Sequence, residues 1–242
     1  MMNKKAIFFD LDGTLLPVDL DTMFGAYFEL LRKSEMIRLI SDDPEEAFQI
    51  FNSAAREMMA NIGRDTNDAV FFEYIEKMTG RGKPFYVRQF NEFYSSAFKS
   101  LSGMVPNAGI QRRILDIARQ KGYRTVLATM PVFPVAATIS RLSWIGLNAG
   151  DFDYISHWEN SSYFKPSPEY YIEVLQKLGL EAKDCIMVGN NIEEDMCAQR
   201  LGFEVFLVTG YEIGAYKAGV YKSGDLAALL KWVKKLPPAE VQ

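Results

Sequence analysis

The chain has 242 residues, of which 48% are hydrophobic and 24% are charged, and its formal net charge is −4. These values are typical of a globular protein that buries a sizeable core. The length allows one large domain or one domain that carries a smaller insertion. A net negative charge argues against a nucleic-acid partner, because a surface that binds a duplex needs to be basic.

The sequence contains no recognisable membrane or export segment. No apolar run approaches the roughly 20 residues that span a bilayer. Lys4 and Lys5 precede an apolar run that Asp10 cuts short, which is unlike a signal peptide. Cys185 and Cys197 lack zinc-ligand spacing and are expected to be small buried hydrophobes. We expect a cytoplasmic protein with no membrane partner, and the sequence leaves a monomer and a homodimer both open.

A short buried strand is predicted at residues 6–9, because four consecutive apolar or small residues lie between Lys5 and Asp10. Asp10 and Asp12 follow this strand, and Gly13 then allows a sharp turn. Ligands of open parallel sheets bind outside the carboxyl ends of the strands, so the two aspartates are candidate site residues. Taken alone, the same residues would also suit an ordinary turn.

Residues 17–103 have a helical pattern almost throughout. The predicted helices lie at 22–33 with Asp21 as N-cap, from Pro44 onward with apolar residues along one face, at 66–78 and at 85–99. Stripes of Met and Phe in this segment are expected to form the core of a helical bundle. We therefore predict an inserted helical cap domain at residues 17–103.

From residue 104 onward, strands and helices alternate. The predicted helices lie at 108–121, 134–146, 167–178, 192–201 and 225–236, and the predicted strands at 125–129, 153–156, 185–189 and 205–209. Strands separated by single helices indicate a doubly wound parallel sheet. The predicted fold is an α/β core domain formed by residues 1–16 and 104–242, with the helical domain inserted after the first strand.

Four sequence segments near strand ends offer polar groups to one crevice. They are Asp10 and Asp12, Thr129, Lys165, and the run 189–195. In this order, the set resembles the haloacid dehalogenase-like hydrolase superfamily. The motifs of that superfamily are Asp-x-Asp-Gly-Thr, a Thr or Ser at a strand end, a Lys, and a Gly-Asp run followed by a further acid. The match is closest to phosphatases with a helical cap after the first strand, such as the phosphoglycolate phosphatases.

The resemblance implies a phosphomonoester hydrolase with defined residue roles. Asp10 would attack phosphorus and form an aspartyl-phosphate, and Asp12 would act as general acid and base. Thr129 would bind a phosphoryl oxygen, and Lys165 would neutralise both the phosphoryl group and Asp10. The cofactor implied is Mg²⁺, which prefers oxygen ligands; its predicted ligands are Asp10, the backbone carbonyl of Asp12, Asn190 and Asp195.

Two residues depart from the superfamily pattern. Asn190 stands where the superfamily usually has Asp, so the metal site has one negative charge fewer. Met130 stands where Asn often follows the Thr, although its backbone N–H can still donate to phosphate. Asp195 keeps the second acidic position, whereas Glu193 and Glu194 are interpreted as acids that suit the first turn of a helix.

The predicted cap would close over the site and select a small soluble phosphorylated substrate. Arg64 and Arg81 are the candidates to bind a further anionic group of that substrate, because each lies at a Gly-containing break between helices. Three alternatives stay open. They are a catalytically weakened relative that binds a phosphorylated ligand, a phosphomutase, and a phosphonate-cleaving enzyme that would need a cap lysine such as Lys83.

Overall fold

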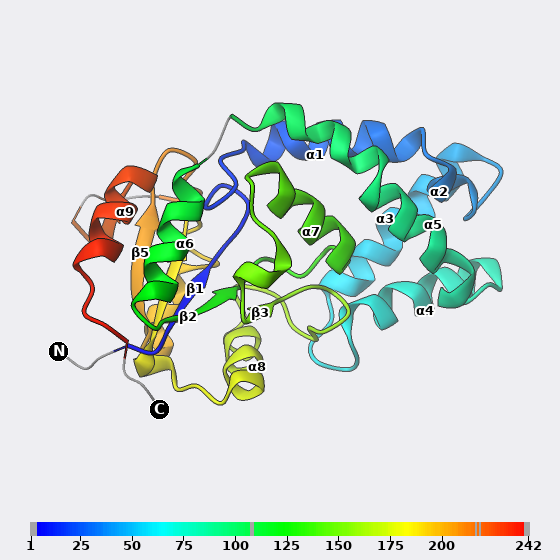
Figure 1. The fold of residues 1–242 in the computed structure, drawn as a ribbon. Helices are drawn as coiled ribbons and strands as arrows, with labels where there is room; N and C mark the ends of the chain where they lie inside the picture. The colour runs from blue at the N-terminus through cyan, green and yellow to red at the C-terminus, as the bar shows by residue number, and fades with distance from the viewer. Residues whose placement is uncertain (1–3, 107–108, 216, 218, 240–242) are drawn as a thin grey trace.

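A parallel sheet of six strands forms the centre of one half of the molecule in the computed structural model, which describes residues 4–106, 109–215, 217 and 219–239 (Figure 1). The strands are β1 (Ala6–Phe9), β2 (Arg124–Leu127), β3 (Tyr154–Ile155), β4 (Cys185–Gly189), β5 (Glu204–Val208) and β6 (Lys222–Gly224). Their order across the sheet is β3-β2-β1-β4-β5-β6, and every neighbouring pair is parallel. The predicted doubly wound α/β fold is confirmed.

Alternate residues of the strands face two different helical layers. On one face, Ile7 and Phe9 pack with α6 (Ile110–Gln120), α7 (Val135–Trp144) and α9 (Leu226–Lys235). On the other face, Ala6 and Phe8 pack with α8 (Pro168–Leu178) and the short 3₁₀ helix η4 (Met196–Leu201). Both faces of β1 are therefore buried, as its unbroken apolar run predicts.

The helices between β1 and β2 form a second cluster, here called the helical unit. It consists of α1 (Leu20–Arg32), α2 (Glu35–Arg38), α3 (Pro44–Met59), α4 (Asn67–Thr79), α5 (Lys83–Ser95) and the 3₁₀ helix η1 (Ala97–Met104). Figure 1 shows this unit extending to the right of the sheet, with α7 beside it. Its aromatic core also contains Phe133 and Trp158 from loops at the strand ends, so the unit packs directly over the edge where β2 and β3 finish.

Several local features differ from the sequence prediction. Asp19, and not Asp21, caps α1, because its carboxylate accepts the backbone N–H of Thr22. The predicted helix at 192–201 is wrong in its first turn, where Asn191 accepts the N–H groups of Glu193 and Glu194 and no helix starts before Met196. The strand β6 and the short helix α2 were not predicted. Residue 108, the expected start of α6, lies outside the described residues.

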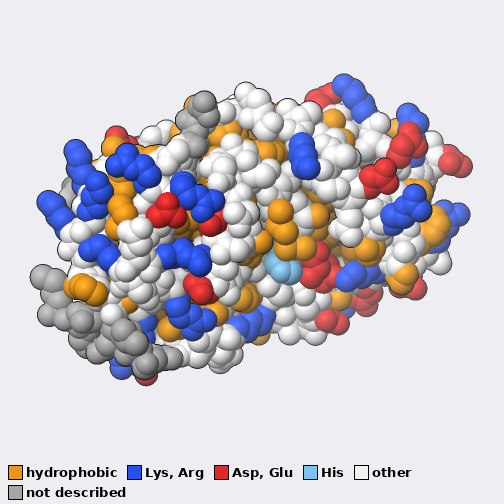
Figure 2. All heavy atoms as spheres, viewed as in Figure 1, with side chains coloured by type: hydrophobic (Ala, Val, Ile, Leu, Met, Phe, Trp, Pro, Cys, Tyr) orange, Lys and Arg blue, Asp and Glu red, His pale blue; other side chains and the backbone are white. Residues whose placement is uncertain are grey.

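The face of the molecule seen in Figure 2 carries both signs of charge. Lys and Arg side chains are intermixed with Asp and Glu on the face seen in Figure 2, and hydrophobic side chains form small patches between them. Among the described residues, no helix combines the length and the apolar character that a membrane span requires.

Candidate active site

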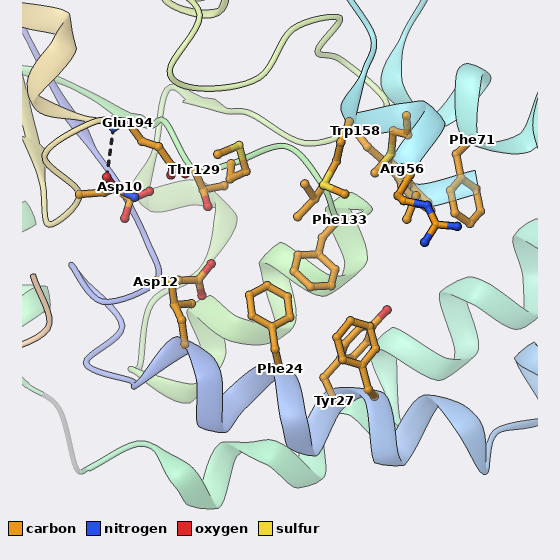
Figure 3. A pocket seen from close by; sticks show the side chains of 18 of the residues that line it. Asp10, Asp12, Phe24, Tyr27, Arg56, Phe71, Thr129, Phe133, Trp158 and Glu194 are labelled. Atoms are coloured by element: carbon orange, nitrogen blue, oxygen red, sulfur yellow. Dashed lines mark hydrogen bonds between the residues drawn. The ribbon is translucent and has the colours of Figure 1, made fainter. Parts of the chain in front are cut away.

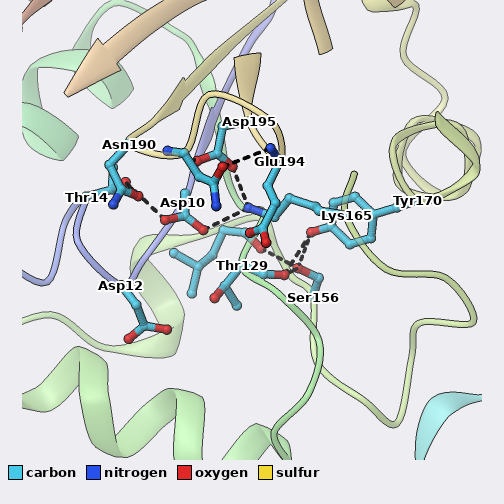
Figure 4. Close-up of polar contacts among 12 residues, drawn as sticks. Asp10, Asp12, Thr14, Thr129, Ser156, Lys165, Tyr170, Asn190, Glu194 and Asp195 are labelled. Carbon is cyan, nitrogen blue, oxygen red and sulfur yellow. Dashed lines mark hydrogen bonds and ion pairs between the residues drawn. The ribbon is translucent and has the colours of Figure 1, made fainter. Parts of the chain in front are cut away.

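Lys165 is the centre of the polar cluster at the strand ends (Figure 4). Its Nζ lies 2.8 Å from Oδ1 of Asp10, which follows β1, and 2.6 Å from Oδ1 of Asp195, which follows β4. The three side chains are almost fully buried. Burial alone would lower the pKa of Lys165, but the carboxylates of Asp10 and Asp195 together raise it well above its usual value. Lys165 therefore keeps its positive charge.

The hydroxyl of Thr14 lies between Asp10, the candidate nucleophile, and Asn190, which departs from the superfamily pattern. Its Oγ1 lies 3.0 Å from Oδ2 of Asp10 and 3.0 Å from Oδ1 of Asn190. One hydroxyl proton can serve one acceptor at a time, so the two oxygens share this donor. The Asp10 carboxylate is thus held through both of its oxygens, by Lys165 on one side and by Thr14 on the other.

Asn190 is fixed by both ends of its amide. While Oδ1 faces Thr14, Nδ2 donates to the backbone carbonyl of Tyr211 at 2.6 Å. This contact ties the loop after β4 to the loop after β5. Gly13 is needed directly opposite, because its φ is +77° and a Cβ there would lie 2.2 Å from Nδ2 of Asn190. An aspartate at position 190 could not make the Tyr211 contact, since a carboxylate has no donor.

Asp195 is positioned by a sharp turn after Gly189. The Oδ2 of Asp195 accepts the N–H of Asn191, while Oδ1 meets Lys165. A Cβ at position 189 would lie 2.2 Å from Oδ2 of Asp195, so only glycine leaves room for the carboxylate. This inward position of Asp195 explains why the predicted helix does not start at Ile192.

Asp12 lies apart from the Lys165 cluster and pairs with Arg141 of α7. The Arg141 side chain is completely buried, and its guanidinium lies 4.7 Å from the ring centroid of Phe133. Burial raises the pKa of Asp12, and Arg141 opposes this shift without cancelling it. A raised pKa favours the protonated carboxyl that a general acid needs.

Two buried oxygen atoms at the site have no hydrogen-bond partner among the residues that the structure describes. They are Oγ1 of Thr129 and Oδ1 of Asp12. Leaving a buried polar group unpaired is costly, so such atoms call for a missing partner. Because both residues line the same cavity, the two atoms are suited to contact a bound molecule there.

The cavity has a volume of about 400 Å³ and extends from these polar groups into the helical unit (Figure 3). In Figure 3, Asp10, Asp12 and Thr129 lie at one end, Phe24 and Phe133 lie in the middle, and Arg56 lies at the other end. Volumes of this size are typical of sites for small molecules. The site therefore consists of a polar end formed by the strand ends and a larger compartment formed by helices.

The predicted site residues divide into two groups. Those that line or adjoin the cavity include Asp10, Asp12, Thr129, Met130, Lys165, Asn190 and Asp195. Arg64, Arg81 and Lys83 are not among the lining residues. Arg64 pairs with Glu73 at 2.6 Å, Arg81 covers the ring of Phe85, and Lys83 pairs with Asp68.

Four residues near the cavity were not assigned to the site from the sequence: Thr14, Arg141, Arg56, which was interpreted as a surface charge, and Glu194. Thr14 is part of the Asp-x-Asp-Gly-Thr motif, so its signal was present. Arg141 could have been noticed as one arginine within an otherwise apolar and small-residue helix. Glu194 was assigned to a first helical turn that does not form, and burial raises its pKa at the cavity wall.

The donor set fits a magnesium ion. No three His, Cys, Asp or Glu residues are grouped as a metal site in the part of the chain that the structure describes. Asp10 and Asn190 nevertheless present a carboxylate and an amide oxygen on either side of the Thr14 hydroxyl. Magnesium commonly uses one or two carboxylates, together with water and substrate phosphate, and needs no protein cage.

Comparison with known proteins agrees with this geometry. A family model described as haloacid dehalogenase-like hydrolase matches residues 4–202, so the chain belongs to this hydrolase family. The resemblance inferred from the motifs is confirmed, and phosphatase-named relatives support a phosphatase. One such relative is the ribulose-1,5-bisphosphate 5-phosphatase of Halopiger xanaduensis, which is 26% identical over 92% of this chain and 90% of its own length.

Further relatives have the same general character. The glyceraldehyde 3-phosphate phosphatase of Methanothermobacter thermautotrophicus is 26% identical over 91% of this chain and 92% of its own. Among solved structures, a HAD phosphatase from Thermococcus onnurineus is similar, with a TM-score of 0.59 and 19% identity over 97% of this chain and all of that chain. That structural likeness concerns the fold.

Proposed function

We propose that this protein is a Mg²⁺-dependent phosphomonoester hydrolase that works through an aspartyl-phosphate on Asp10. The supporting observation is the Asp10–Lys165–Asp195 cluster beside the unpartnered hydroxyl of Thr129. Transfer of a phosphoryl group needs an aligned nucleophile and positive charge around the phosphoryl oxygens. The phosphatase names of the relatives support the same reaction.

In the first half of the reaction, a carboxylate oxygen of Asp10 forms a bond to phosphorus while the bond to the leaving oxygen breaks. Lys165 and Thr14 hold the carboxylate so that it cannot rotate away. Thr129 donates its free hydroxyl proton to a phosphoryl oxygen, and Lys165 neutralises part of the negative charge. When bound, the metal ion adds positive charge against the phosphoryl group.

Asp12 is proposed to move the proton at the leaving oxygen. It gives a proton to that oxygen as the ester bond breaks, and then takes one from the water that hydrolyses the acyl phosphate on Asp10. Arg141 acts as a positioning residue, because its guanidinium fixes one Asp12 oxygen and leaves the other, unpartnered, free to reach the substrate.

The helical unit is proposed to serve as the cap of this enzyme, which corresponds to residues 17–103 of the predicted domain division. Its helices α1 and α3 contribute residues to the wall of the cavity that begins at Asp10. Covering the site in this way keeps water from the phosphoryl group and strengthens every charge interaction inside.

The test is hydrolysis of 4-nitrophenyl phosphate by purified protein, with and without Mg²⁺. We expect turnover that a chelator removes and that excess Mg²⁺ restores. Asp10→Asn should reduce turnover to background, because an amide cannot form the acyl phosphate. A folded Asp10→Asn protein with normal turnover would remove Asp10 as nucleophile, and turnover that a chelator leaves unchanged would remove the metal.

The rival proposal is a protein that binds a phosphorylated ligand without hydrolysing it. Asn190 favours it, because the metal site has lost one negative charge. Binding of inorganic phosphate without hydrolysis of any monoester would support this rival. A phosphonate-cleaving reaction has less support, since Lys83 pairs with Asp68 and does not line the cavity.

A further inference from the structure

The compartment beyond the polar end of the cavity is lined mainly by aromatic and aliphatic side chains. Phe24 and Phe28 of α1 stack with centroids 6.1 Å apart, and Phe24 also stacks on Phe133 at 6.1 Å. Met58 and Trp158 contribute to the lining as well. These rings lie directly beyond Asp12 and Thr129, where the group esterified to the phosphate must extend (Figure 3).

The polar atoms of this compartment are few. Tyr27 and Tyr94 both line it, and their hydroxyls hydrogen-bond to each other at 2.7 Å, which leaves one O–H of the pair as a donor. Among the described lining residues outside the strand-end cluster, the remaining polar groups are the side chains of Asn52 and Arg56 of α3 and the indole N–H of Trp158. Arg56 is exposed at the far end and donates to Ser53 of its own helix at 2.8 Å. The middle of the compartment therefore offers apolar contacts.

We propose that the substrate is a phosphomonoester whose leaving group is a ring-sized apolar body and not a polyhydroxylated sugar or a short hydroxy acid. This inference rests on the proposed phosphatase function. Burying an apolar ring against these side chains is favourable, roughly in proportion to the area removed from water. A sugar in the same place would bury hydroxyls that the rings cannot pair.

The proposal departs from the substrates in the names of the relatives. Two of those relatives are named for ribulose bisphosphate and glyceraldehyde phosphate, which are polar throughout. Both relatives are only 26% identical to this chain, and the compartment is formed mostly by the helical unit. The chemistry can therefore be common while the leaving group differs.

The first experiment compares matched pairs of esters. Cyclohexylmethyl phosphate and glucose 6-phosphate both carry a six-membered ring on a CH₂–O–phosphate, and propyl phosphate and glycerol 3-phosphate share a three-carbon chain. Hydroxyl groups make an alcohol a better leaving group, so intrinsic reactivity opposes the expected order. We expect kcat/KM for cyclohexylmethyl phosphate to exceed that for glucose 6-phosphate by about a hundredfold. Equal values, or the reverse order, would overturn the proposal.

The second experiment fills the compartment. Ala55 lines it from α3, so Ala55→Trp should lower kcat/KM for cyclohexylmethyl phosphate by about tenfold or more and leave ethyl phosphate nearly unchanged. Gln49→Trp is the matched control, because Gln49 is exposed on the same helix and does not line the cavity. If Ala55→Trp lowers both substrates equally in a folded protein, the compartment does not hold the leaving group. If that variant fails to fold, the matched esters decide the question.

A binding measurement separates this inference from the proposed function. The fluorescence of Trp158 should respond to 1-naphthylmethylphosphonate, which cannot lose its phosphoryl group to Asp10, at far lower concentration than to methylphosphonate. Trp158→Phe should remove the response. If the protein hydrolyses no monoester, the proposed function fails, while selective binding of the naphthyl compound still supports the apolar compartment. Equal affinities for the two phosphonates would overturn it.

Discussion

The two ends of the cavity use different kinds of residue and have different origins. The strand-end wall gathers Asp10, Lys165 and Asp195 into a network in which each charge has a partner. The opposite wall, from α1 and α3, offers rings and aliphatic chains with few polar atoms. The first wall is suited to hold a phosphoryl group in one orientation. The second wall supplies apolar surface for the leaving group of the substrate. An enzyme can therefore keep the same reaction at the first wall while the second wall changes which substrate it prefers.

The strand-end wall should be the more sensitive of the two to loss of one partner. Lys165→Met removes the cation from between Asp10 and Asp195 and leaves buried carboxylates uncompensated, which should lower the free energy of unfolding by about 3–5 kcal/mol. Lys33→Met is the control, because Lys33 and its partner Glu29 are both largely exposed, and it should cost no more than about 1 kcal/mol.

These two variants are to be compared by urea unfolding without Mg²⁺ or phosphate, so that no ligand can replace the lost charge. Similar losses for Lys165→Met and Lys33→Met would mean that the network contributes no more than a surface ion pair. The distinction between the two walls would then rest on chemistry alone.

The strand-end wall was also the part that the sequence could predict. Parallel strands finish at one edge, so Asp10 and Thr129 could be brought together from the order of elements, and the resemblance to the superfamily added Lys165. Which helical side chains face the cavity depends on how the helices pack against one another. The hydrophobic periodicity of the sequence does not determine that packing. Arg64 and Arg81 were therefore placed at the cavity because of nearby glycines, whereas the structure puts Arg56 there.

Arg141 shows a second limit of sequence reasoning. Its helix, α7, follows Thr129 directly in the chain, but the burial of its guanidinium against Asp12 depends on the contact between α7 and the turn after β1. The first turn of the helix predicted at 192–201 is wrong for a related reason. A contact between distant residues, Asp195 and Lys165, overrides the local helical preference.

Within the strand-end wall, Asp12 can be tested separately from the charge network. Asp12→Asn should lower kcat by roughly a hundredfold or more, because an amide cannot donate or accept the proton at the leaving oxygen. Asn is preferable to Ala, since its amide oxygen can still accept from Arg141, whereas Ala would leave that buried guanidinium unpaired. Hydrolysis of aryl phosphates, whose leaving groups need less protonation, should fall less than hydrolysis of alkyl phosphates. An equal decrease for both ester types would contradict the general-acid role.

Asn190 lies on the strand-end wall and can be tested with two readouts of opposite sign. Asn190→Asp should tighten Mg²⁺ binding by about tenfold, because it adds an anionic oxygen to a site for a hard cation. The same change removes the donor to the Tyr211 carbonyl and should lower the stability of the metal-free protein by about 1–3 kcal/mol. Calorimetric titration and urea unfolding measure the two effects. If Mg²⁺ affinity is unchanged, Asn190 is not a ligand and serves to tie the two loops together.

The smallest expected effect is at the far end of the opposite wall, which α1 and α3 form. Arg56 is exposed there and lines the cavity, so it can meet an anionic group on the leaving group only in partial contact with water. Arg56→Gln should therefore raise KM for 4-carboxybenzyl phosphate by about two- to fivefold, as for an exposed ion pair worth less than about 1 kcal/mol, with benzyl phosphate unaffected. Added salt should reduce the difference in KM between wild type and variant, because an exposed ion pair is screened.

Arg64→Gln and Arg81→Gln are matched controls, since neither residue lines the cavity, and both should leave the two KM values unchanged. An effect from Arg64 or Arg81 equal to that from Arg56 would show that the helical wall is arranged differently around bound substrate, and would return those two arginines to the site.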